Sequence, residues 1–139
     1  MPAGILIIDD DPIVRQFVDL ALVQRGYNAS SVGTGELGLQ ALQTTRWDLV
    51  LLDIDMPDMT GLEVLRRLRR SHRVKVMMMT AKGDVTTVRQ ALATGADGYI
   101  VKPFSAPDLL KRVGAMLKST RSTSPAKATD DDGTPPDSL

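Results

Sequence analysis

Short and almost continuous runs of apolar residues are the feature that most restricts how this chain can fold. Three stand out, at residues 5–8 (ILII), 49–52 (LVLL) and 74–79 (VKVMMM). Runs of four to six residues have the length of strands, and apolar residues at successive positions indicate a strand that is buried on both faces, as in a parallel sheet. Weaker runs at 28–32 and 99–101 bring the number of predicted strands to five.

A segment with apolar residues at helical spacing follows each predicted strand. These segments cover residues 14–22, 34–42, 62–68, 85–92 and 109–117. Parallel strands that alternate with helices require right-handed crossovers, which place helices on both faces of the sheet. The pattern therefore predicts an α/β fold with a five-stranded, doubly wound parallel sheet.

The composition changes at Ser119, where the sequence becomes STRSTSPAKATDDDGTPPDSL. Small, polar, Pro and Gly residues dominate this segment, and such a composition does not build a hydrophobic core. We therefore predict one folded domain at residues 1–118, followed by a disordered tail or linker at 119–139.

The overall composition argues against several classes of protein. The chain has 17 basic and 17 acidic residues and no cysteine. It therefore lacks the excess of positive charge that is typical of nucleic-acid binding, and it has no disulfides or cysteine-bound metals. No apolar run is long enough to cross a membrane, and no signal peptide is visible. We expect a cytoplasmic protein with no membrane contact and no direct binding of nucleic acid by this domain.

Polar residues stand where the predicted strands end. Asp9 and Asp10 follow the first strand, Asp53 the third, Thr80 the fourth and Lys102 the fifth. The carboxyl ends of parallel strands share one edge of the sheet, which is where open α/β sheets bind their ligands. We therefore expect these side chains to meet in one site.

The chemistry of this predicted site points to a metal and a phosphoryl group. Two carboxylates about 5 Å apart repel each other by about 3 kcal/mol at an effective dielectric constant near 20, and a hard cation such as Mg²⁺ or Mn²⁺ would offset this repulsion. A carboxylate can itself accept a phosphoryl group, which an ammonium and a hydroxyl would then stabilise. No glycine-rich phosphate loop is present, so a nucleotide donor is not expected. Asp11 precedes Pro12 and is expected to cap the next helix.

Four motifs, ILIIDDDP, DLVLLDIDMPDMTGLEVL, MMMTAKGD and GADGYIVKPF, resemble those of the receiver domain of bacterial two-component response regulators. The resemblance covers nearly all of the predicted domain and implies the flavodoxin-like (CheY-like) fold. It implies that Asp53 accepts a phosphoryl group from a sensor histidine kinase or a phosphotransfer protein. It also implies that Asp9, Asp10, Asp53 and the backbone carbonyl of Asp55 bind Mg²⁺, and that Lys102 contacts Asp53.

The same resemblance implies a conformational switch. Thr80 would move its hydroxyl onto the phosphoryl group, Tyr99 would turn inward, and Ala81 must be small to leave the site open. Pro103 is expected to follow a cis peptide bond, and Gly61 to have a positive φ. The surface formed by the fourth helix, fifth strand and fifth helix would then change shape. It would act on a downstream partner or an output domain, or form a homodimer.

Two further residues beside the site are charged. Asp55 and Lys82 could pair across the mouth of the site and screen the phosphoryl group from water, which would slow dephosphorylation. The alternative is that both charges are independently solvated.

Other readings of the sequence remain open. The domain is either a complete single-domain regulator, which we favour, or the N-terminal part of a longer regulator, for example a DNA-binding one. LLDIDMP also resembles the nucleophile motif of haloacid-dehalogenase-type phosphohydrolases, but Pro57 stands where that motif has Thr or Val, and here the motif follows the third strand. We expect a signalling protein with no enzymatic activity beyond its own phosphorylation and dephosphorylation. The basic stretch at residues 66–75 is expected to be a solvated helix face.

Overall fold

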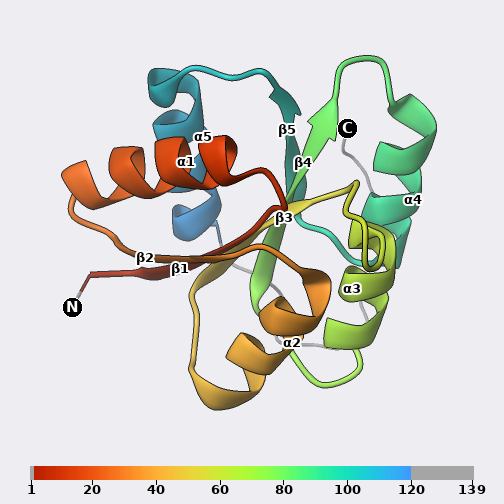
Figure 1. Cartoon of the computed structure of the whole chain (residues 1–139). Coiled ribbons are helices and arrows are strands. Elements are labelled where there is room, and N and C mark those ends of the chain that lie inside the picture. Colours follow the sequence, from red (N-terminus) through yellow and green to blue (C-terminus); the bar gives the residue numbers. More distant parts are fainter. Residues whose placement is uncertain (1, 120–139) are drawn as a thin grey trace.

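The computed structural model describes residues 2–119, and its helices and strands alternate as the sequence predicts (Figure 1). The elements are β1 (Gly4–Ile8), α1 (Pro12–Gln24), β2 (Asn28–Val32), α2 (Gly35–Thr44), β3 (Leu49–Asp53), α3 (Gly61–Leu68), β4 (Lys75–Ala81), α4 (Val85–Thr94), β5 (Gly98–Lys102) and α5 (Ala106–Lys118). The five strands form one parallel sheet in the order β2-β1-β3-β4-β5. The predicted doubly wound α/β fold is therefore confirmed.

Alternate residues of each central strand point to opposite faces of the sheet, and helices cover both faces (Figure 1). Ile5 and Ile7 of β1 pack in a cluster with buried residues of α1 and α5. Leu6 and Ile8 pack in a second cluster with residues of α2, α3 and α4. Both sets are fully buried, which explains why the strand sequence is continuously apolar. No helix in residues 2–119 has the length and hydropathy required to cross a membrane.

The ends of the strands differ slightly from the prediction. β4 was expected at residues 74–79, but it begins at Lys75 and continues through Thr80 and Ala81. It is longer because these two residues stay in register with Val101 and Lys102 of β5. The backbone of Thr80 is therefore part of the sheet.

Gly61 is needed for a different reason from the one expected. The predicted positive φ is wrong, since the glycines with positive φ in the described chain are Gly26, Gly83 and Gly95. A Cβ atom added to Gly61 would instead lie 2.2 Å from the backbone oxygen of Asp53. A glycine is required because α3 begins directly against the end of β3.

The basic stretch at residues 66–75 is not wholly solvated. Arg66 and Arg67 are exposed and pair with Glu63 on the surface, as expected. Arg69 is different, because its side chain is only 12% exposed and pairs with Asp97 at 3.0 Å. Its guanidinium also donates to the carbonyl oxygens of His72, Val74 and Gly95. Arg69 therefore ties the end of α3 to the loop that leads into β5.

Candidate functional site

Three carboxylates meet at the carboxyl edge of the sheet, because β1 and β3 are neighbours there. Asp9 directly follows β1 and is completely buried, and Asp53, the last residue of β3, is 6% exposed. Asp10 is exposed and opens the cluster to solvent. One carboxylate oxygen from each of these residues lies within 4.8 Å of the other two. The structure therefore brings together the three acids that the sequence singled out.

Lys102 supplies the positive charge of the cluster. It is the last residue of β5, and its ammonium group donates to Asp9 Oδ2 at 2.8 Å and to Asp53 Oδ1 at 3.1 Å. The strand order places β4 between β5 and β3, so the side chain crosses the end of β4 to reach both acids. The peptide bond between Lys102 and Pro103 is cis, the conformation expected from the sequence.

The electrostatic environment makes Asp53 unusual among the acids. Burial, together with the nearby charge of Asp9, raises the pKa of Asp53 to about 7, against the opposing effect of Lys102. For Lys102, burial acts to lower the pKa, but its hydrogen bond to Asp9 and the charges of both acids outweigh this effect and raise the pKa. The single ammonium group of Lys102 therefore does not fully offset the negative charge of the carboxylates around it.

The donor set fits a hard divalent cation. Within residues 2–119, Asp9, Asp10 and Asp53 form the one group of three or more acidic, His or Cys side chains close enough to share a metal. All three donors are oxygens, which Mg²⁺ and Mn²⁺ prefer. The exposed Asp10 carboxylate leaves an open side where water ligands can remain, as Mg²⁺ usually requires. A cation here would offset the surplus negative charge that Lys102 leaves.

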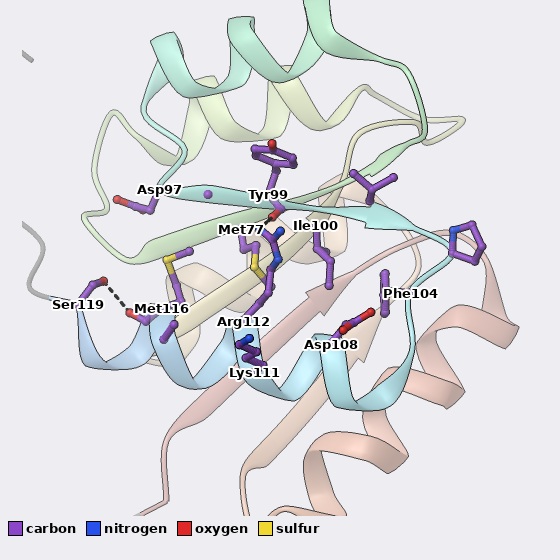
Figure 2. A pocket seen from close by; sticks show the side chains of 14 residues that line it. Met77, Asp97, Tyr99, Ile100, Phe104, Asp108, Lys111, Arg112, Met116 and Ser119 are labelled. Atoms are coloured by element: carbon purple, nitrogen blue, oxygen red, sulfur yellow. Dashed lines mark hydrogen bonds between the residues drawn. The ribbon is translucent and has the colours of Figure 1, made fainter. Parts of the chain in front are cut away.

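The side chains of the two residues predicted to respond to phosphorylation have partners other than the acids. Thr80 is buried, and its hydroxyl donates to the carbonyl oxygen of Ala81 at 3.3 Å. Tyr99 is 36% exposed, and its ring lies 5.7 Å from the guanidinium carbon of Arg112. In Figure 2 the ring of Tyr99 and the side chain of Ile100 project to opposite sides of β5. The tyrosine is therefore in an outward orientation.

Asp55 and Lys82 are both exposed beside the acidic cluster. The ion pair considered for them is not formed, since the salt bridges among the described residues do not include one between these two side chains. Two exposed side chains gain little from pairing in water, and each loses conformational freedom by doing so. In this structure they follow the solvated alternative.

Sequence reasoning missed two residues that hold the loops around the site. Arg15 donates from Nη1 to the backbone oxygen of Asp9 at 2.7 Å. Asp58 accepts hydrogen bonds from the backbone amides of Gly35 and Glu36, each at 3.1 Å, and so joins the β3–α3 loop to the start of α2. A signal for Arg15 was available, because a cation near the N-terminus of a helix opposes the helix dipole. Nothing in the sequence distinguishes Asp58 from other loop acids.

Asp11 does cap α1, as predicted, by accepting from the amide of Ile13.

Comparisons with known proteins agree with this geometry. The family model described as the response regulator receiver domain matches residues 5–114. The DNA-binding response regulator MtrA of Mycolicibacterium smegmatis is 40% identical over 118 residues, which are 85% of this chain and 52% of that protein. The transcriptional regulatory protein AfsQ1 of Streptomyces coelicolor is 37% identical, with the same shares of the two chains. The chain thus spans about half the length of these curated relatives.

Solved structures show the same domain. The chemotaxis response regulator CheY4 of Vibrio cholerae superposes with a TM-score of 0.80 at 30% identity, covering 84% of this chain and 99% of that one. A structure of NtrX from Brucella abortus gives a TM-score of 0.81 at 29% identity, covering 85% of this chain but 27% of the longer one. These matches are to receiver domains and not to the phosphohydrolases considered as an alternative.

Proposed function

Since the chain belongs to the response regulator receiver domain family, we propose that it accepts a phosphoryl group on Asp53 from a sensor histidine kinase or a phosphotransfer protein. The observation that carries this proposal is the position of Asp53. Its carboxylate lies at the end of the central strand, in contact with Lys102 and close to Asp9 and Asp10.

The proposed transfer uses the side chains as the geometry arranges them. An oxygen of the Asp53 carboxylate attacks phosphorus as the N–P bond of a phosphohistidine breaks, and the imidazole leaves with the bonding electrons. This requires ionised Asp53, which Lys102 favours by donating to it. Asp9, Asp10 and the backbone carbonyl of Asp55 would hold Mg²⁺, which supplies positive charge to the phosphoryl oxygens when it is bound. Lys102 would then contact one of these oxygens.

Exposed apolar side chains beside the site support the approach of a protein donor. Ile13 and Phe17, in the first turns of α1, are 75% and 40% exposed, and Leu20 one turn further on is 59% exposed. A donor that reaches Asp53 past Asp10 would pass over the start of α1. Burial of these three side chains would contribute to its binding.

We propose that phosphorylation is passed to the α4-β5-α5 surface through Thr80 and Tyr99. The phosphoryl group adds charge and strong hydrogen-bond acceptors, and the Thr80 hydroxyl would turn from its contact with Ala81 to meet it. The small Ala81 side chain leaves room for this movement. A groove of about 820 Å³ between α4 and β5 offers space for Tyr99 to turn inward. Beryllofluoride with Mg²⁺ should then shift the NMR signals of Thr80, Tyr99 and α4, and shifts confined to Asp53 would contradict the switch.

The α4-β5-α5 surface has the exposed apolar side chains that a partner or a second copy would cover. Val85 and Leu92 of α4 and Val101 of β5 are 58%, 43% and 38% exposed. On the other side of β5, a second cavity of about 750 Å³ is lined by residues of β5 and α5 (Figure 2). These features support an output by protein contact, either with a separate effector or with an attached domain.

Two forms of output are considered. Because the chain spans about half of the DNA-binding and transcriptional regulators that it matches, the comparisons favour a receiver that forms the N-terminal part of a longer regulator. The single-domain reading, which the sequence suggested, is kept as the alternative. The proposed domain limits are 1–118, and the segment predicted to be a tail lies, apart from Ser119, outside the described residues.

Asp55 and Lys82 are retained as positions that tune dephosphorylation. Both are exposed beside Asp53, where they can meet an attacking water without pairing with each other. We expect Lys82→Ala to change the rate at which phosphate is released from Asp53. An unchanged rate would remove Lys82 from the proposal.

Phosphotransfer profiling tests the central proposal. Purified candidate sensor kinases carrying labelled phosphohistidine are mixed with the protein in Mg²⁺, and acetyl phosphate serves as a small-molecule donor. Label should move to the wild type and not to Asp53→Asn, and EDTA should stop the transfer. Asp48→Asn, at the other end of β3, is the matched control and should still accept label. Label on Asp53→Asn, or none on the wild type from any donor, would refute the assignment.

A further inference from the structure

Arg15 is a partly buried arginine for which the structure shows no carboxylate partner. It lies in the second turn of α1, and none of the salt bridges found in residues 2–119 includes it. Its hydrogen bond is to a backbone atom, the carbonyl oxygen of Asp9, at 2.7 Å. A cation near the N-terminus of a helix is disfavoured by the helix dipole, and burial adds a cost. An arginine at this position therefore lowers stability unless its hydrogen bond serves another purpose.

The contact of Arg15 completes the set that holds Asp9. The amide of Asp9 donates to the carbonyl oxygen of Val32 in β2 at 3.1 Å. Its carboxylate accepts from the amide of Asp11 at 2.9 Å and from Lys102 at 2.8 Å. Arg15 donates to the carbonyl oxygen of Asp9, so every polar group of Asp9 has a hydrogen-bond partner. That carbonyl belongs to the peptide bond between Asp9 and Asp10, and its orientation determines where the Asp10 side chain begins.

We propose that Arg15 is a positioning residue for the divalent cation: by holding the Asp9 carbonyl it orients the Asp9–Asp10 peptide, and so places the Asp10 carboxylate beside Asp53. This inference rests on the proposed metal site. Asp10 is the exposed member of the cluster, so its own side chain has the fewest contacts to fix its position. Outer contacts that orient metal ligands typically change metal affinity by about 10- to 100-fold.

The charge of Arg15 and its positioning role predict opposite effects on metal affinity. If Arg15 acted only through its charge, its removal would relieve repulsion of the cation and tighten Mg²⁺ binding, and lysine would substitute for it. If Arg15 acts through its contact, glutamine and lysine should both weaken Mg²⁺ binding, because neither reproduces the planar guanidinium that donates to the carbonyl.

Gly33, in the turn after β2, provides an independent way to disturb the same contact. A Cβ atom added there would lie 2.8 Å from Nη1 of Arg15 and 3.4 Å from its Cζ. Nη1 is the end of a flexible side chain and can move away. Gly33→Ala should therefore shift the guanidinium off the Asp9 carbonyl while every charge is kept.

The test measures the Mg²⁺ dissociation constant at fixed ionic strength, from the amide NMR shifts of Asp9, Asp10 and Ile54. We expect Arg15→Gln and Arg15→Lys each to raise the dissociation constant about tenfold. Gly33→Ala should also raise it, but should add little in the Arg15→Gln background, because both changes remove one contact. The control is Arg25→Gln, which removes an exposed charge from the other end of the same helix and should leave the constant unchanged.

Urea unfolding in EDTA shows whether each variant folds. If Arg15→Gln does not fold, Gly33→Ala alone decides the question. Unchanged or tighter Mg²⁺ binding in Arg15→Gln, or in Gly33→Ala if Arg15→Gln does not fold, would overturn the positioning role and leave the metal site intact. Absence of Mg²⁺ binding by the wild type itself would instead overturn the metal site, and the inference with it.

Discussion

Replacing Asp53 with asparagine should make the metal-free domain more stable near neutral pH, and the gain should depend on pH. The folded protein keeps a proton on Asp53 up to about pH 7, because burial and the charge of Asp9 oppose ionisation, whereas an unhindered aspartate loses it near pH 3.8. Unfolding therefore releases a proton between these two values. The stability of the wild type should fall as pH rises through this window and become level above it.

The size of the effect follows from the width of the window. Across this window, each pH unit lowers the free energy of unfolding of the wild type by about 1.4 kcal/mol at most. A window of about three units therefore limits the total loss of stability to about 4 kcal/mol. Solvent reaches the cluster from the side of Asp10, and this screening reduces the expected penalty to about 2 kcal/mol. Asparagine has a similar shape and does not titrate, so it escapes this penalty at every pH.

Urea unfolding of both proteins in EDTA, from pH 4.5 to 8, measures the difference. The free energy of unfolding of Asp53→Asn minus that of the wild type should grow with pH until about pH 7 and then stay constant. When Mg²⁺ is added at pH 7.5, this difference in the free energy of unfolding should become smaller or change sign, because the cation stabilises only the protein that binds it, which is the wild type with its complete set of carboxylates. A difference that does not change with pH would refute the electrostatic description of the site.

Three other substitutions test separate parts of the structure. Lys102→Met removes two hydrogen bonds from the acids, so the pKa of Asp53 should rise further above 7, measured by carboxyl ¹³C NMR titration; a lower pKa would contradict the role of the ammonium. Gly61→Ala places a Cβ atom 2.2 Å from the Asp53 carbonyl oxygen and should cost about 3 kcal/mol in urea unfolding, whereas Gly114→Ala, with open space at its Cβ, should be neutral or stabilising. Arg69→Met removes the partly buried ion pair with Asp97 and the hydrogen bonds of the guanidinium to three backbone carbonyl groups, and it should cost about 3 kcal/mol, while the same change at the exposed Arg66 should cost under about 1 kcal/mol.

Much of the fold was predictable because its signals are local. A strand buried on both faces must be apolar at successive positions, and a helix on the sheet must repeat its apolar residues every three or four, so the alternation is visible without any tertiary contact. The meeting of Asp9, Asp10 and Asp53 was also predictable, since parallel strands end at one edge of the sheet. The cap formed by Asp11 depends only on adjacent residues.

Predictions failed where a residue's role depends on distant neighbours. Gly61 was assigned a turn conformation, but the reason for glycine there is the closeness of the Asp53 backbone. Arg69 was assigned to a solvated face, although its partner Asp97 is 28 residues away in sequence. The contact of Arg15 was not predicted, because its partner is a backbone carbonyl group. Every residue has such a group, so the sequence does not show which one an arginine contacts.

The sequence by itself determined the layers of this protein and the edge of the sheet where its acids gather, because periodicity and strand direction are properties of short segments. Only the tertiary structure decided how those acids behave. Lys102 is 93 residues from Asp9 in the chain yet donates to it, and the raised pKa of Asp53 comes from burial and from a neighbouring strand. Burial and charge are properties of the space around a side chain, and folding brings segments from the whole chain into that space.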